Sequence, residues 1–160
     1  LPYNISTEIL IKWILNLNSN LWFDKLILLF QKEVADRITS NSDTSNYGRL
    51  SIISNWRLNV KKIIDVKPSS FKPKPKVEST LLLFTPKIKF FKLKNSKSIE
   101  DVTRIFFNQK RKKIKKPLNK LFKNSDQIAK KLNLNLDLRP QNLDFQTYYL
   151  LAKELEDLRS

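Results

Sequence analysis

Strand-like segments occur only in the first part of the chain, before Pro86. Three segments carry apolar or β-prone residues typical of strands, and helical spacing of apolar residues occurs between them. The predicted strands are Leu26–Phe30, Lys61–Val66 and Thr80–Phe84, and the predicted helices before Pro86 are 6–17, 32–39 and 49–59. After Pro86 the spacing is helical throughout, over 99–110, 117–123, 125–133 and 141–158. The chain is therefore predicted to be α/β followed by all-α.

This change of pattern predicts the domain organisation. We expect an α/β portion over 1–85, a lysine-rich linker over 86–98 and a helical domain over 99–160. The run Lys67–Lys76 contains three prolines, so it is predicted to connect two strands and not to form a helix or a central strand. The continuous apolar run Leu26–Phe30 suits a strand that is buried on both faces, as in a parallel sheet.

Composition excludes several kinds of chemistry. The 160 residues include no Cys and no His, so disulfides, thiol or imidazole catalysis and a Cys- or His-based metal site are excluded, and no metal site is expected. With Gly48 as the single glycine, the chain carries no glycine-rich phosphate or dinucleotide loop. No apolar run approaches membrane-spanning length and no signal peptide is recognisable, which predicts a cytoplasmic protein without membrane association. The chain opens on Leu1 and lacks Met, which predicts a processed product or a fragment.

Positive charge is concentrated in one part of the chain. There are 31 Lys and Arg against 15 Asp and Glu, and the net charge is +16. Residues 91–134 alone carry 14 basic and 3 acidic side chains. Such a field favours a polyanion, with nucleic acid ahead of an anionic membrane. The alternative is that the basic block at 110–116 is only a solvated helix face. The candidate nucleic-acid-binding residues are Lys110, Arg111, Lys112, Lys113, Lys115 and Lys116.

Two aromatic residues are candidates for contact with a nucleobase. If Leu1–Tyr3 follows a strand, its Pro-Tyr pair forms a rigid turn that holds the Tyr3 ring at the ligand-binding edge of an α/β sheet, where it can stack on a base. The alternative is a frayed terminus. Phe71 lies in the proline-stiffened connection, and its alternative role is to anchor that connection on the sheet. The three tryptophans, Trp13, Trp22 and Trp56, are assigned to the core.

Six short segments of the chain resemble motifs of known methyltransferases. Leu1–Tyr3 resembles the end of the Asn-Leu-Pro-Tyr motif of S-adenosylmethionine-dependent adenine N6-methyltransferases. The other segments are QKEVADRI at 31–38, YGRLS at 47–51, FKPKPKVES at 71–79, FFNQKRK at 106–112 and RPQNL at 139–143. In the same order, these segments resemble segments of the small-subunit rRNA adenine dimethyltransferases, with Gln141 in place of an acidic residue of the family pattern. Each segment is weak alone, but the ordered set covers nearly the whole chain.

The resemblance implies an enzyme that uses S-adenosylmethionine to dimethylate N6 of two adjacent adenosines near the 3′ end of small-subunit rRNA. It would act as a monomer on a pre-ribosomal particle during ribosome biogenesis. The implied catalytic residues are Leu1 in the pocket backbone, Pro2 with a carbonyl that accepts from the amine, Tyr3 stacked on the base, and Phe71 beside it. The implied fold is the C-terminal part of a Rossmann-like methyltransferase domain plus a small helical domain.

The family's glycine-rich cofactor loop precedes its Asn-Leu-Pro-Tyr motif and has no counterpart in this chain. The resemblance therefore implies a fragment without assignable cofactor-binding residues, and we expect the chain alone to be inactive and not to bind S-adenosylmethionine. Two other readings stay open. One is a non-catalytic RNA-binding module. The other is a large-subunit rRNA methyltransferase of the antibiotic-resistance type, although 47–51 and 71–79 fit the small-subunit group better.

Overall fold

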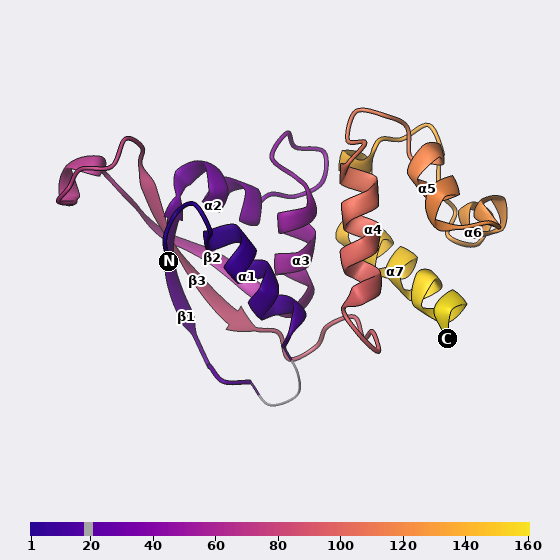
Figure 1. Ribbon diagram of the computed structural model, residues 1–160, viewed down its shortest axis with the longest axis horizontal. Coiled ribbons are helices and arrows are strands. Elements are labelled where there is room, and N and C mark those ends of the chain that lie inside the picture. Colours follow the sequence, from indigo (N-terminus) through magenta and orange to yellow (C-terminus); the bar gives the residue numbers. More distant parts are fainter. Residues whose placement is uncertain (18–20) are drawn as a thin grey trace.

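The computed structural model describes residues 1–17 and 21–160. Within these residues, the chain forms a three-stranded sheet with three helices against one face, followed by a group of helices (Figure 1). The predicted order, an α/β portion followed by helices, is confirmed. The predicted elements agree with the observed ones to within a few residues at their ends.

The sheet has β3 at its centre. Strands β1 (Leu26–Gln31) and β2 (Leu58–Val66) both pair antiparallel with β3 (Ser79–Pro86). Leu28 lies opposite Leu82, which aligns their side chains on the same face. The proline-containing connection 67–78 joins β2 to β3, as predicted, and contains the short 3₁₀ helix η1 (Pro68–Ser70).

Helices α1 (Ser6–Leu15), α2 (Lys32–Ile38) and α3 (Arg49–Arg57) pack on one face of the sheet (Figure 1). Their apolar side chains meet alternate residues of β1 and β3, which closes the centre of this face to water, whereas residues 61–65 of β2 stay exposed. The most buried members of this core are Leu10, Ile14, Phe30, Ile53, Leu82 and Phe84.

The second part of the chain is helical. It comprises α4 (Lys97–Phe107), α5 (Lys115–Leu121), α6 (Ser125–Lys131), the 3₁₀ helix η2 (Pro140–Asn142) and α7 (Phe145–Arg159). α4 packs along α7. The carboxylate of Asp144 caps α7 by accepting a hydrogen bond from the Thr147 amide at 2.8 Å. No helix in the described part of the chain has the length and apolar character needed to cross a membrane.

Helix α3 belongs to both cores. Leu50 and Ile53 face the sheet core, whereas Ile52 and Trp56 pack with the side chains of α4 and α7. The Tyr149 hydroxyl donates to the Ile52 carbonyl at 2.9 Å. The predicted boundaries at 85 and 98 stay a prediction, but the hydrophobic cores before and after them both contain side chains of α3.

Two sequence-based expectations are wrong. β1 was expected in a parallel sheet with both faces buried, but it pairs antiparallel with β3, and its Ile27 is 57% exposed because the described helices cover only the other face. Trp22 was assigned to the core, but it is 61% exposed. It follows α1 on the surface and packs edge-on against Trp13 and Phe23. Trp56 is buried as expected.

Candidate functional site

The Tyr3 ring is held at one end of the sheet. Its hydroxyl hydrogen-bonds with the hydroxyl of Ser79, which is fully buried, and its carbonyl accepts from the Ser6 hydroxyl at 3.2 Å. Ser79 is the first residue of β3 and lies opposite Gln31 and Val66, the last residues of β1 and β2. Tyr3 is therefore fixed where β1 and β2 end, and the turn is not a frayed terminus.

The two residues before Tyr3 lie at the surface. Leu1 and Pro2 are both exposed. The Pro2 carbonyl accepts one hydrogen bond, from the Ile5 amide at 3.3 Å. A carbonyl oxygen has two lone pairs, so that of Pro2 retains capacity for a second donor. Its predicted role as an acceptor is compatible with this geometry.

Ion pairs fix the strand ends beside Ser79. The Lys32 ammonium lies 3.2 Å from Glu78 and 3.6 Å from Asp65. Asp65 also accepts a hydrogen bond from the Thr80 hydroxyl at 2.6 Å, which is the main reason why the pKa of Asp65 lies below its usual range. These contacts join α2, β2 and β3 at the end of the sheet that carries Tyr3.

Phe71 lies in the connection between β2 and β3, directly after η1. Its amide donates to the Pro68 carbonyl at 3.2 Å, and the ring is half-buried. The connection projects from the sheet at the left of Figure 1. It starts and ends at the same end of the sheet as Tyr3, although a direct role of Phe71 beside a base stays a prediction.

The basic side chains at 110–116, which we call the basic segment, span the coil after α4 and the first turn of α5. All are exposed except Lys110, which is half-buried and donates to the Ser45 carbonyl at 2.7 Å. Lys113 pairs with Asp137 at 2.7 Å. The other members have no ion-pair partner among the described residues. The predicted helix-face alternative does not apply to the residues before Lys115, because they are not helical.

The position of Lys115 and Lys116 is unfavourable for helix stability. Both lie in the first turn of α5, where the helix dipole favours acidic residues. Neighbouring lysines also repel one another, which adds to the cost. A bound polyanion would remove both penalties, and an RNA-binding role of these two lysines stays a prediction.

A cleft of about 400 Å³ adjoins the basic segment and adds two arginines that the sequence analysis missed. Arg37 from α2, Arg49 from α3 and Lys110 line it. Arg37 also contacts Glu33 at 3.3 Å, and Arg49 lies 3.7 Å from Glu100. Arg37 and Arg49 lie in the family-like segments 31–38 and 47–51. This position could have marked them as candidate site residues from the sequence alone.

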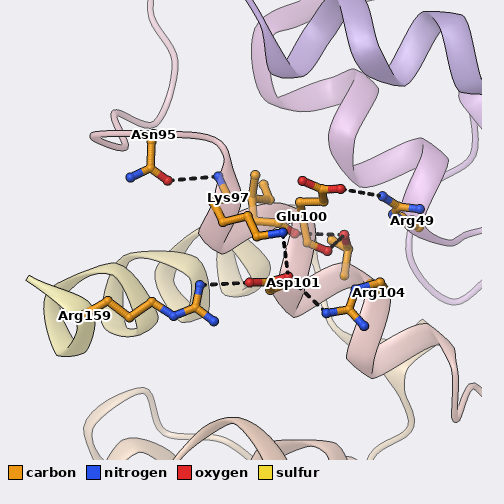
Figure 2. A network of polar contacts seen from close by, with 9 residues as sticks. Arg49, Asn95, Lys97, Glu100, Asp101, Arg104 and Arg159 are labelled. Atoms are coloured by element: carbon orange, nitrogen blue, oxygen red, sulfur yellow. Dashed lines mark hydrogen bonds and ion pairs between the residues drawn. The ribbon is translucent and has the colours of Figure 1, made fainter.

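A carboxylate network anchors α4 in the helical part (Figure 2). Asp101 is only 4% exposed and contacts Arg159 at 2.8 Å, Arg104 at 3.1 Å and Lys97 at 3.6 Å. Burial by itself would raise the pKa of Asp101, but the hydrogen bonds from Arg159 and Arg104 and the Lys97 charge hold it below the usual value. The network joins α4 to the end of α7.

We expect Asp101→Asn to lower the free energy of unfolding at neutral pH by about 1–2 kcal/mol, because charged hydrogen bonds are lost while their arginine partners are half exposed. The folded-state pKa is depressed, so this contribution is complete above the unfolded-state pKa of about 3.9 and disappears as the pH falls through the folded value. Urea unfolding at pH 7 and in acid measures it. Asp24→Asn, at an exposed carboxylate, is the control. An equal loss at both pH values would contradict the ionic origin.

Gly48 does not form a cofactor cradle. Its backbone is extended, with φ of −176°, and it directly precedes α3. A Cβ at this position would make ordinary contacts with the Phe107 ring at 3.8 Å, so no close ligand approach requires a glycine here. Gly48 therefore offers no cradle for S-adenosylmethionine.

The chain combines a sheet that holds Tyr3 at one end with a following group of helices that carries an exposed basic segment. A dimethyladenosine transferase from Plasmodium falciparum has this fold with a TM-score of 0.75 and 29% identity, over 94% of this chain and 62% of the other. Residues 1–157 match the family model for ribosomal RNA adenine dimethylases, and the chain belongs to this family.

The similarity to curated relatives is high. The chain is 64% identical to ribosomal RNA small subunit methyltransferase A of Pelagibacter ubique, over 99% of its residues and 61% of the relative. The corresponding Wolbachia protein is 36% identical over 99% of this chain and 57% of the relative. The chain thus spans about three fifths of the length of these relatives. The 23S rRNA methyltransferase ErmE, at 18% identity and a TM-score of 0.62, shares the fold.

Proposed function

We propose that this chain is part of an enzyme that dimethylates adenosine N6 in small-subunit rRNA. The observation that carries the proposal is the 64% identity to a small subunit methyltransferase A over 99% of the chain. The likeness to ErmE is too low to favour the large-subunit alternative, and no observation favours a non-catalytic RNA-binding module. Action on a pre-ribosomal particle in the cytoplasm, as a monomer, belongs to the same proposal.

The residues at the sheet edge act on the target adenine. Its exocyclic amine is a weak nucleophile, because its lone pair is delocalised into the ring. The free lone pair of the Pro2 carbonyl accepts from this amine and stabilises the positive charge that develops on the nitrogen. Tyr3 stacks on the base, with its ring orientation set by Ser79. Leu1 forms the adjacent backbone and Phe71 flanks the base.

The basic segment holds the RNA. Its exposed cations bind phosphates, and the cleft with Arg37 and Arg49 extends the cationic surface from the helical part toward α2. Arginine adds bidentate contacts to phosphate that lysine cannot make. These contacts orient the RNA without reading its sequence.

The methyl donor proposed for the complete enzyme is S-adenosylmethionine. The chain's own contribution is to bind the RNA, orient the target base and accept hydrogen bonds from its amine.

The test of this function is methyl transfer by the complete enzyme that contains this chain. We expect radiolabelled methyl groups from S-adenosylmethionine to appear as N6,N6-dimethyladenosine in unmethylated small ribosomal subunits. Mass spectrometry of the digested nucleosides identifies the product. Large ribosomal subunits are the matched control. Modification of large-subunit RNA alone would contradict the proposal, and no transfer to either RNA would overturn the enzymatic role.

A further inference from the structure

A second hollow lies at the end of α3 opposite the cleft that Arg37, Arg49 and Lys110 line. It has a volume of about 550 Å³ and is formed by the end of α3, the segment after β3 and the start of α7. We call it the linker hollow. Half of its lining residues are aromatic: Trp56, Phe90, Phe91, Phe145 and Tyr149. Neither the basic segment nor Tyr3 contributes to it.

The walls of the linker hollow are held in place by hydrogen bonds. The Trp56 indole donates to the Phe91 carbonyl at 2.7 Å, and the Lys87 amide donates to the Arg57 carbonyl at 2.8 Å. The Lys87 ammonium also donates to the Asn55 side chain at 3.0 Å. The surface is therefore formed before any ligand binds, which lowers the entropic cost of binding.

The charge around the linker hollow is positive. No Asp or Glu occurs between Ser79 and Ile99, whereas this stretch contains five lysines. Lys89 lines the hollow, is exposed and has no ion-pair partner among the described residues. Asp144 is the single acidic lining residue, and its carboxylate already accepts from the Thr147 amide at 2.8 Å and hydroxyl at 2.6 Å.

The hollow combines a stacking surface, a cation and polar groups. The Phe90 ring is half-buried and lies 3.9 Å from the Arg57 guanidinium, so it is supported by a cation. The Gln146 side chain is exposed at the rim and offers an amide that can pair with a base edge. Aromatic rings beside lysines are the arrangement that binds unpaired nucleotides.

We infer that the linker hollow binds one unpaired nucleotide of a single-stranded RNA. The base stacks on Phe90, the neighbouring phosphate contacts Lys89, and Gln146 contacts the base edge. The inference rests on the proposed function for the presence of RNA. It adds an RNA-binding site separate from both the target-base edge and the basic segment.

Binding of a fluorescent single-stranded oligoadenylate by the complete enzyme that contains this chain, measured by anisotropy, tests the site. We expect Phe90→Ala to weaken binding by about 5-fold or more, because one stacked base contributes about 1–3 kcal/mol. An oligonucleotide of abasic residues should bind the unchanged protein and the Phe90→Ala variant equally. We expect Lys89→Ala to reduce the slope of log affinity against log salt by about 0.7.

Matched controls separate the site from general effects. Trp22→Ala removes an exposed aromatic residue and Lys94→Ala removes a charge, both outside the linker hollow. Unchanged RNA affinity in both Phe90→Ala and Lys89→Ala would overturn the inference. That result is expected if the hollow binds an apolar protein segment and not RNA. An equal loss for abasic RNA would overturn base stacking. If only substitutions in the basic segment weaken binding, the inference fails while the proposed function stands.

Discussion

Tyr3→Ala in the complete enzyme is expected to lower methyl transfer to small-subunit rRNA by about 10- to 100-fold, with little change in RNA affinity. The reason is that one stacked base contributes about 1–3 kcal/mol, and each 1.36 kcal/mol corresponds to a tenfold rate change. RNA affinity should be retained because the proposed phosphate contacts lie on the basic segment. Single-turnover methyl transfer and equilibrium RNA binding, measured on the same protein, check both expectations.

Two variants separate the ring of Tyr3 from its hydroxyl. Tyr3→Phe keeps the stacking surface and loses the hydrogen bond to Ser79, so its loss of rate should be much smaller than that of Tyr3→Ala. Ser79→Ala removes the same bond from the other side and should match Tyr3→Phe. Equal losses of rate and RNA affinity in Tyr3→Ala would mean that the residue is structural.

The second large effect is expected from replacing residues 110–113 of the basic segment by alanine. If all four side chains meet phosphates, RNA affinity at about 0.1 M salt should fall by about 100-fold or more, and the salt slope should decrease by about 3. The Lys113–Asp137 pair reduces the contribution of Lys113, because part of its charge is already neutralised. Filter binding across a salt series measures affinity and slope together.

A variant with the same change in net charge is the control. Four exposed lysines elsewhere can be replaced by alanine, namely Lys12, Lys25, Lys61 and Lys94. Because these lysines are dispersed over the surface, their loss should change affinity only through the weaker long-range field. If both variants lose affinity equally, the basic segment is a solvated surface and its position carries no function.

Much of the local structure was predictable from local patterns. The strands on either side of Lys67–Lys76 were confirmed. The connection between them was predictable because proline removes a backbone donor and restricts φ in any tertiary context. The cap of α7 at Asp144 is also local, since the carboxylate reaches an amide three residues away. The site at the sheet edge was less predictable. The motif indicated Tyr3, but its partner Ser79 is 76 residues away in the sequence.

Local sequence patterns were enough to predict the order of elements, to exclude thiol and imidazole chemistry and to locate the positive charge. Each depends on residue type or on spacing within a few residues. The tertiary structure decided the antiparallel pairing of β1 with β3, the sharing of α3 between two cores and the cleft that joins Arg37 and Arg49 to Lys110. These features depend on which distant segments pack together, and that choice is made by the total burial of apolar surface, which no local pattern records.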